Sequence, residues 1–298
     1  MKIGLLTSSR SDYGLYKPLI KKLIFNKELN LKVIAFGTHF SEKYGYTYDQ
    51  IRNDVINVDF KLKTYVPSET TKTEINKSMQ DVFKIFSEFW KENNFDFVYV
   101  LGDRYEMYMA VFSGLVYNVK YGHISGGEET FGAIDNVFRH SISIQSKLNF
   151  CSTEIYKNRL TEILGTNEYI FNSGALSIDS LFQTKILNKS ELNQLTGFDF
   201  TEKTILCTFH PETYNNRNEF YINEICNAFK HLNEYQILFT MPNADPGSDV
   251  IRNVIYKFSK ENKKRIKCFE NLGNKAYLSA MKYCSMMVGN TSSGFVEA

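Results

Sequence analysis

Short apolar runs alternate along the whole chain with longer segments of helical periodicity. Phe97–Leu101 and Thr204–Thr208 are clear examples of such runs, and each has the length of one buried strand. Strands that alternate with helices are typical of βαβ units, which build a parallel sheet with helices on both faces. The pattern therefore predicts an α/β fold.

The first half of the chain contains one series of such units. Its predicted strands are Lys2–Thr7, Leu31–Phe36, Phe97–Leu101, Lys120–His123, Leu148–Cys151 and Tyr169–Asn172. Its predicted helices are Tyr13–Phe25, Asn76–Asn93, Tyr105–Tyr117 and Ile134–Ile144. Asp12 and Asp103 each precede one of these helices, where an aspartate commonly serves as the N-cap.

A polar, mainly helical stretch at Ile178–Asp199 is interpreted as a linker, and a second series follows it. The strands of this series are Thr204–Thr208, Gln236–Thr240, Ile266–Phe269 and Ser285–Gly289, and its helices are Asn218–His231, Asp249–Glu261 and Asn274–Met281. The two series predict two doubly wound domains, residues 1–175 and 176–298, with a cleft between them.

Composition narrows the classes of protein that this chain can be. Its 298 residues are 43% apolar and 23% charged, which is typical of a globular protein. A net charge of +2 gives no support to a nucleic-acid-binding surface. No apolar stretch approaches the roughly 18 residues that a membrane-spanning helix needs. The five cysteines are scattered and form no C-x-x-C pair, so a reducing cytoplasm is expected.

Ionisable residues crowd the stretch from Phe97 to His140. Asp103 follows a predicted strand, and Glu128 follows the Gly-Gly pair at 126–127. Asp135 and Arg139 have the i, i+4 spacing that places two side chains on one helix face. Taken singly, Asp103 could be an N-cap. Asp135 and Arg139 could form an ordinary surface salt bridge worth about 0.3–0.5 kcal/mol. Together, three carboxylates and a cation predict an acid/base pocket, and hence an enzyme.

The second half contributes polar loops at the ends of its predicted strands. His210 directly follows Thr204–Thr208, although a lone histidine is about as often an ordinary turn residue. The stretch 290–294 combines hydroxyls and backbone N–H groups at a predicted helix start, where anions bind, but an ordinary N-cap turn would look the same. The loops that contain Asn243 and Arg10 are weaker candidates of the same kind.

The residues in this order resemble the hydrolysing UDP-N-acetylglucosamine 2-epimerases of sialic-acid biosynthesis. The matching landmarks are RSDY at 10–13, GDR at 102–104, HISGGE at 123–128, GAIDNVFRH at 132–140, HP at 210–211, PN at 242–243 and GNTSSG at 289–294. The GGE…GAID…RH block is the most specific part. Non-hydrolysing relatives carry a Glu-Ala-Gly-Leu-Arg type of segment there, and its absence favours the hydrolysing branch.

The resemblance implies a GT-B-like fold of two Rossmann-like domains and a nucleotide-sugar substrate. It implies inversion at C2 with loss of UDP through a glycal, without a metal or redox cofactor, in a homo-oligomer. The catalytic residues it implies are Asp103, Glu128, Asp135, Arg139 and His210. The substrate-binding residues it implies are Arg10, Arg104, Asn243, Asn290, Ser292, Ser293 and Glu297, with Glu297 on the ribose.

Three questions remain open at this point. The family continues past Glu297, so the chain is expected to lack a C-terminal part of the second domain and to have poor activity as it stands. The exact sugar and base are open, since relatives use diacetamido sugars or GDP-linked donors. A GT-B glycosyltransferase and a nucleotide-sugar-binding fragment without turnover are the alternatives, and neither explains three carboxylates as well.

Overall fold

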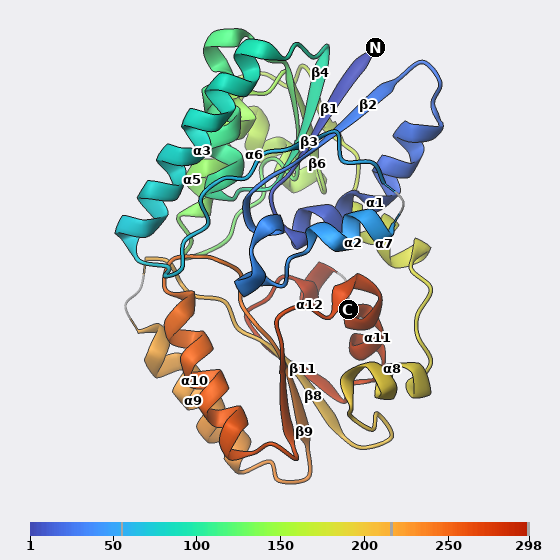
Figure 1. The fold of residues 1–298 in the computed structure, drawn as a ribbon, viewed down its shortest axis with the longest axis vertical. Coiled ribbons are helices and arrows are strands. Elements are labelled where there is room, and N and C mark those ends of the chain that lie inside the picture. Colours follow the sequence, from blue (N-terminus) through green and yellow to red (C-terminus); the bar gives the residue numbers. More distant parts are fainter. Residues whose placement is uncertain (55, 215–216, 297–298) are drawn as a thin grey trace. The chain divides into compact units, whose positions relative to one another are not determined.

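The chain forms two compact units, each built around its own parallel sheet. The computed structural model describes residues 1–54, 56–214 and 217–296 (Figure 1). Unit 1 contains Met1–Ser68 and Lys72–Ser180, and unit 2 contains Glu69–Thr71 and the chain from Leu181 onward. The α/β class that the apolar runs predict is confirmed.

Unit 1 is a seven-stranded sheet in the order β3-β2-β1-β4-β5-β6-β7. The strands are β1 (Lys2–Thr7), β2 (Asn30–Ala35), β3 (Phe60–Lys61), β4 (Phe97–Leu101), β5 (Tyr121–Ile124), β6 (Leu148–Cys151) and β7 (Ile170–Asn172). All neighbours pair in parallel, with Leu5 opposite Val33 on one side and Tyr99 on the other. The chain order reverses between β1 and β4, which is the topological switch point of this sheet.

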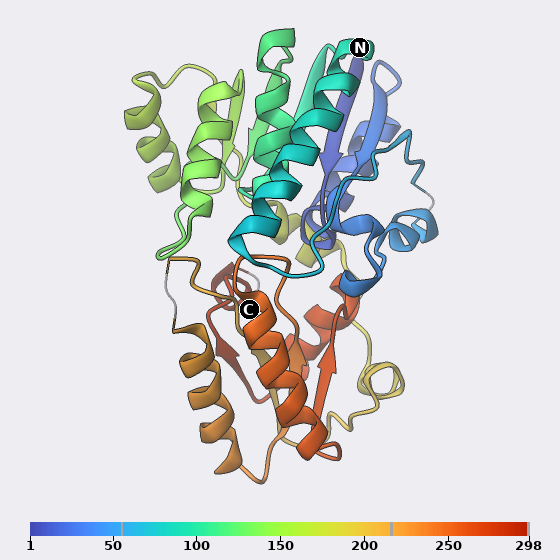
Figure 2. The same cartoon turned by 60° about the vertical axis from the view of Figure 1, so that its left-hand side comes forward.

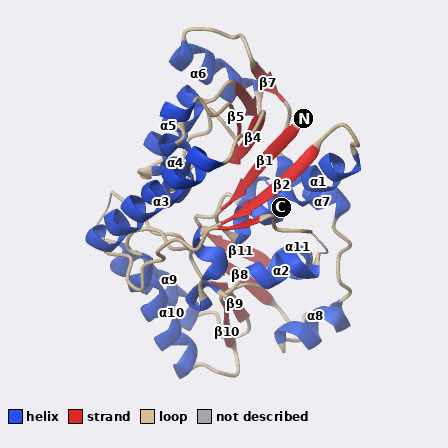
Figure 3. Cartoon of the chain, turned by 45° about the horizontal axis from the view of Figure 1, so that its top comes forward, coloured by secondary structure: helices blue, strands red, loops and turns tan. Residues whose placement is uncertain are grey.

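Helices cover both faces of the unit 1 sheet (Figure 3). They are α1 (Arg10–Phe25), α2 (Tyr48–Asn53), α3 (Lys72–Glu92), α4 (Tyr105–Ser113), α5 (Asp135–Gln145), α6 (Glu154–Leu164) and α7 (Leu176–Gln183). Successive strand residues point to opposite faces, so Leu6 packs with α3 and α4 while Leu5 packs with α1 and α2. Both faces are therefore buried, which explains why the strands are continuous apolar runs.

Unit 2 has a four-stranded parallel sheet in the order β10-β9-β8-β11. The strands are β8 (Thr204–Thr208), β9 (Gln236–Thr240), β10 (Ile266–Phe269) and β11 (Met286–Gly289); the helices are α8 (Lys189–Thr196), α9 (Asn218–Lys230), α10 (Ser248–Glu261), α11 (Gly273–Tyr283) and α12 (Ser293–Val296). The helices α9 and α10 lie side by side on one face (Figure 2), and α8 and α11 pack on the other. The switch point lies between β8 and β11.

Some predicted elements differ from those of the structure. The stretch interpreted as a linker, Ile178–Asp199, is helical as predicted and contains the boundary between the units, but its helix α8 also buries Leu192 in the core of unit 2. Its polar composition reflects the exposed side of a short amphipathic helix. The short elements α2 and β3 are missing from the prediction. The helix predicted at Tyr105–Tyr117 ends at Ser113, and a 3₁₀ turn, Leu115–Tyr117, follows.

The two aspartates predicted as N-caps have other roles. The N-cap of α1 is Ser9, and Asp12 is the third helical residue, whose carboxylate closes a capping box. Asp12 accepts hydrogen bonds from the backbone N–H groups of Ser8 at 2.6 Å and Ser9 at 3.1 Å. The N-cap of α4 is Arg104, and its side chain makes no capping hydrogen bond, so Asp103 lies outside the helix. In the part of the chain that the structure describes, no helix is long and apolar enough to cross a membrane.

Candidate active site

The carboxyl ends of the central strands of unit 1 carry the ionisable residues that the sequence singled out. Asp103 follows β4, the turn with Glu128 follows β5, and Ser152 follows β6. Because these parallel strands are adjacent, their carboxyl ends meet at one edge of the sheet. In open α/β sheets, ligands bind at this edge, next to the switch point. This edge is therefore the candidate active site of unit 1.

Asp103 forms an ion pair with Arg139, which α5 brings to the same edge. The Arg139 side chain is only 6% exposed and that of Asp103 is 24% exposed. Arg139 also donates from Nη1 to Oδ1 of Asn136, at 3.3 Å. The buried guanidinium balances the charge of Asp103 and fixes the direction of its carboxylate.

Glu128 lies in a different environment at the same edge. Its Oε1 accepts a hydrogen bond of 2.7 Å from the Ser152 hydroxyl. Burial raises the pKa of Glu128, and Asp103 adds to this effect, while Ser152 and Arg139 oppose it. A carboxyl group with a raised pKa can hold a proton and donate it, whereas a carboxylate paired with arginine is suited to accept one. The edge thus presents two carboxyl groups in unlike environments.

Asp135 is the first residue of α5 and stands one turn before Arg139, where the sequence predicts it. The structure adds a partner for Arg139 that spacing could not reveal, since Asp103 lies 36 positions earlier in the chain. One helix start therefore supplies a third carboxylate and the cation.

The sequence predicts that the Gly126-Gly127 pair lets the backbone turn sharply and approach a ligand closely. The approach to a ligand stays a prediction, and the structure gives a further reason for the glycines. In the structure, a Cβ at Gly127 would overlap the carbonyl oxygen of Tyr156 in α6, and Gly127 has φ +76°. Arg159 of α6 donates to the Gly127 carbonyl at 3.0 Å and pairs with Glu129 at 3.0 Å. The glycines thus let the turn that carries Glu128 pack directly on α6.

The two arginines predicted to bind substrate in unit 1 begin helices. Arg10 is the first residue of α1, directly after the end of β1. Arg104 donates to both carboxylate oxygens of Glu106, at 3.2 and 3.1 Å, and Glu106 is 2% exposed. This fork geometry holds the Arg104 guanidinium against α4. Binding of substrate by either arginine stays a prediction.

In unit 2, His210 and Asn290 come together at the switch point between β8 and β11. The Asn290 side chain accepts from the His210 backbone N–H at 2.7 Å and donates to the His210 carbonyl at 2.9 Å. Asn290 therefore ties the end of β8 to the end of β11 and fixes the backbone that presents the His210 side chain. Direct contact of Asn290 with a substrate, which the sequence predicts, remains untested.

The remaining predicted residues of unit 2 lie in loops at the same strand ends. Asn243 follows β9, in a loop held by Arg252, which donates from Nη1 to the Pro242 carbonyl at 2.8 Å. Ser293 begins α12, and its backbone N–H contacts Thr291 Oγ1 at 3.4 Å, while Ser292 is exposed. Glu297 lies outside the described residues.

Sequence reasoning missed Ser152, the hydroxyl partner of Glu128. Its position could have revealed it, because it directly follows the predicted strand Leu148–Cys151, at the same kind of strand end as Asp103. His123 belongs to the recognised cluster, but the sequence assigns it no role. Among the described residues, no group of three or more His, Cys, Asp or Glu side chains is arranged to hold a metal ion.

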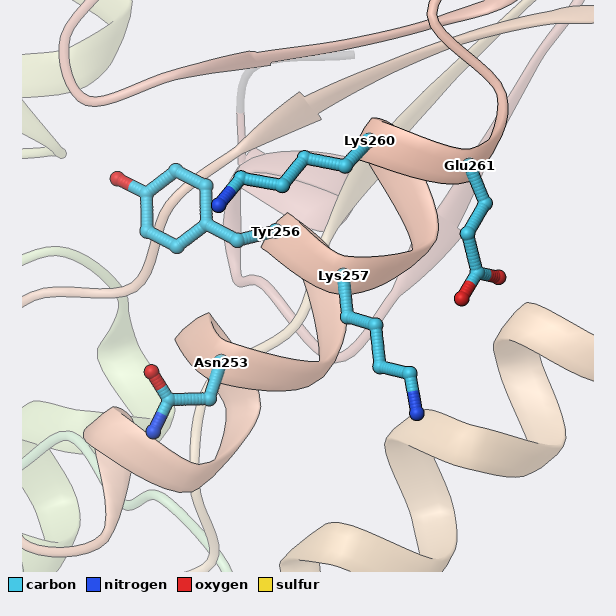
Figure 4. Close-up of a pocket in the computed structure, with 5 residues that line it drawn as sticks. All are labelled: Asn253, Tyr256, Lys257, Lys260 and Glu261. Atoms are coloured by element: carbon cyan, nitrogen blue, oxygen red, sulfur yellow. The ribbon is translucent and has the colours of Figure 1, made fainter.

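A hollow on the outer side of α10 lies apart from the strand-end residues of unit 2. Figure 4 shows the side chains that line it, which are Asn253, Tyr256, Lys257, Lys260 and Glu261. All five come from one helix, and the Tyr256 hydroxyl is bonded to Glu270. The hollow contains none of the candidate residues, and we assign it no role.

Comparison with known proteins identifies a family that this chain matches over most of its length. The family model described as UDP-N-acetylglucosamine 2-epimerase matches residues 21–298. The GDP/UDP-N,N'-diacetylbacillosamine 2-epimerase (hydrolyzing) of Campylobacter jejuni is 34% identical over 100% of this chain and 77% of its own length. The polysialic acid biosynthesis protein P7 of Escherichia coli is 33% identical over 99% of this chain and 75% of its own.

A solved structure supports the fold independently of sequence. The Methanocaldococcus jannaschii UDP-GlcNAc 2-epimerase, in complex with UDP-GlcNAc and UDP, matches with a TM-score of 0.77 at 17% identity. The match covers 98% of this chain and 79% of that one. With a family model across most of the sequence and relatives above 30% identity, the chain belongs to the UDP-N-acetylglucosamine 2-epimerase family.

Proposed function

We propose that the chain is a hydrolysing 2-epimerase of a nucleotide-activated 2-acetamido sugar. The substrate would be UDP-N-acetylglucosamine or a UDP- or GDP-linked diacetamido relative, and the products the free C2-inverted sugar and the nucleoside diphosphate. The observation that carries the proposal is the pair of unlike carboxyl groups, Asp103 on Arg139 and Glu128 on Ser152, at one sheet edge. Two relatives named for hydrolysing or sialic-acid functions support the hydrolysing branch.

The environments of the two carboxyl groups support a proposal for their separate roles. Asp103, balanced by Arg139, would accept the proton from C2 while the bond from C1 to the diphosphate breaks, which yields a glycal and the free nucleotide. Glu128, whose pKa burial raises, would then donate a proton to the opposite face of C2. Water supplies the hydroxyl group at C1 and its remaining proton returns to Glu128, while Asp103 releases the C2 proton to solvent, so the overall reaction consumes one water molecule. Asp135 would serve as the third acid/base group.

Unit 2 would bind the nucleotide. His210 and Asn243 end two neighbouring strands near its switch point, where phosphates and nucleotides bind in this class of sheet. His210 would stabilise the departing diphosphate, whose charge grows as the bond to C1 breaks. The backbone of the loop at 290–293 would contribute further contacts to phosphate.

The test is the reaction in deuterated water, with a panel of UDP- and GDP-linked acetamido sugars. We expect one of them to give free sugar with inverted C2 and one deuterium at C2, detected by NMR and mass spectrometry. Product without deuterium at C2 would contradict the mechanism. Sugar transfer to an added acceptor with C2 unchanged would indicate a glycosyltransferase, and tight nucleotide binding without turnover would indicate a binding protein.

Variants of the carboxyl groups sharpen this test. Glu128→Gln and Asp103→Asn should each lower kcat about 10²–10⁴-fold, the usual range for loss of a general acid or base. Glu154→Gln is the matched control, since Glu154 is a carboxylate in the first turn of α6 with a 59% exposed side chain. It should retain activity within about twofold. Equal loss in all three variants would point to a general effect of charge removal.

A further inference from the structure

His123 is a fully buried polar residue that the proposed reaction does not use. It lies in β5, and its exposed fraction is 0%. A buried imidazole without hydrogen-bond partners would be costly, so both of its ring nitrogens should be bonded. Both are, and the two partners belong to different elements of unit 1.

The partners of His123 define its tautomer. Nε2 lies 2.8 Å from the carbonyl oxygen of Gly102, and Nδ1 lies 2.8 Å from the hydroxyl of Ser143. A carbonyl oxygen only accepts hydrogen bonds, so Nε2 carries the proton and Nδ1 accepts from Ser143. Burial lowers the pKa of His123 to about 3, and the neighbouring Arg139 and His140 act in the same direction. The ring is therefore neutral at physiological pH and does not carry protons in the reaction.

The Gly102 end of this bridge controls the direction of Asp103. The Gly102 carbonyl belongs to the peptide unit that joins Gly102 to Asp103, and this unit is planar. Gly102 has φ +80°, a left-handed conformation that glycine adopts without strain but does not enforce. The hydrogen bond from His123 Nε2 to the Gly102 carbonyl therefore restrains the orientation of the peptide plane that precedes Asp103.

The Ser143 end controls the position of Arg139. Ser143 stands four residues after Arg139 in α5, on the same helix face and one turn further along. One rigid ring thus joins the peptide before Asp103 to the helix turn after Arg139. These are the two partners of the ion pair at the candidate active site.

We propose that His123 is a positioning residue that holds Asp103 and Arg139 in register for the reaction. Its kinetic consequences rest on the proposed function, but its hydrogen bonds do not. A shift of about 1 Å in a catalytic group lowers rates by about a hundredfold, so a restraint of this kind has a measurable effect.

The first test needs no activity. In full-length protein labelled with ¹⁵N at histidine, the His123 ring should show the Nε2–H tautomer, without titration between about pH 5 and about pH 8. A ring that titrates in this range, or that carries its proton on Nδ1, would overturn the proposal. A wild-type protein without epimerase activity would refute the proposed function and leave this readout intact.

The second test is kinetic. His123→Phe keeps an aromatic ring and removes the hydrogen bonds to Gly102 and Ser143. It should lower kcat about ten- to a hundredfold and leave KM within about twofold. It should also shift the acid limb of the pH–rate profile. His123→Gln can keep a donor for Gly102 and should recover part of kcat. Ser143→Ala removes only the hydrogen bond to Nδ1, with little loss of volume, and should also shift the acid limb. It replaces His123→Phe as the test variant if that variant does not fold.

The matched control is Trp90→Phe. Trp90 is 2% exposed and donates from Nε1 to the Ala110 carbonyl at 2.9 Å, in the packing of α3 on α4. It should lower the melting temperature without moving kcat or the acid limb. If folded His123→Phe and Ser143→Ala keep the wild-type kcat and pH profile, or if Trp90→Phe changes them equally, His123 has only a structural role.

Discussion

Two carboxyl groups of the same sheet edge differ in what surrounds them, and this difference is the basis of the proposed chemistry. Asp103 contacts a buried guanidinium, whereas Glu128 contacts a neutral hydroxyl and loses hydration. An enzyme that moves a proton from one face of a carbon to the other needs one group of each kind. In the proposed reaction, these local environments determine which carboxyl group accepts the proton and which one donates it.

The raised pKa of Glu128 predicts a pH-dependent stability difference. The folded state holds the Glu128 proton more tightly than the unfolded state does, so ionisation of Glu128 destabilises the fold as pH rises above its ordinary pKa. Glu128→Gln removes this cost and should melt at a higher temperature than wild type at pH 8. The difference should vanish by about pH 3, where Glu128 is protonated in both states. Thermal melting across this range measures it, and a constant difference would contradict the prediction.

The turn before Glu128 gives a second prediction, based on two glycines with similar backbone angles. Gly127→Ala places a methyl group against the carbonyl of Tyr156, at φ +76°, and should cost about 2–4 kcal/mol. Gly165→Ala is the matched control, because Gly165 has φ +68° and open space around the new methyl group. It should cost about 1 kcal/mol, the backbone term alone. Urea unfolding of both variants measures the difference, and equal losses would show that the contact with α6 is unimportant.

At the scale of elements, the strand ends bring the candidate residues to one edge of each sheet, and neighbouring helices hold them in place. In unit 1, α5 brings Arg139 to Asp103 just beyond β4, and α6 supports the turn after β5. In unit 2, the Asn290 amide joins the ends of β8 and β11. The elements were largely predictable, since a buried parallel strand is a short apolar run between turns. The short elements α2 and β3 were not, because six and two residues are too few to show a period.

The contribution of helix α8 to the core of unit 2 can be tested by substitution. Leu192 is fully buried in the core of unit 2, and Leu195, on the same helix, is 54% exposed. Leu192→Ala should destabilise unit 2 by about 2–5 kcal/mol, through lost burial and a cavity. Leu195→Ala should change stability by less than about 0.5 kcal/mol. Chemical denaturation monitors both variants, and an unchanged midpoint for Leu192→Ala would show that α8 contributes little to the core of unit 2.

At the scale of the whole molecule, the chain has two separate sets of hydrophobic cores. Unit 1 buries Val98 among residues of α3 and α4, and unit 2 buries Leu206 among residues of α8 and α11. Each set encloses its own sheet, so each unit has the basis for cooperative unfolding of its own. A single free energy of unfolding does not describe such a chain.

We expect calorimetry to resolve two transitions. Val98→Ala should lower the midpoint of one transition by several degrees, and Leu206→Ala that of the other, since each removes buried apolar contacts from one core. Both variants shifting one common transition would show that the two units unfold together. Differential scanning calorimetry of wild type and both variants decides between these outcomes.

The sequence by itself determined the α/β class, most strands and helices, and the positions of the candidate ionisable residues at the strand ends. These depend on local patterns: apolar runs mark buried strands, and carboxylates directly after them mark the edge where ligands bind. The tertiary structure alone decided which of these residues act on one another. Arg139 pairs with Asp103 across 36 positions, and Ser152 with Glu128 across 24. Partner choice and burial depend on packing in three dimensions, and they fix the charge and direction of each carboxyl group.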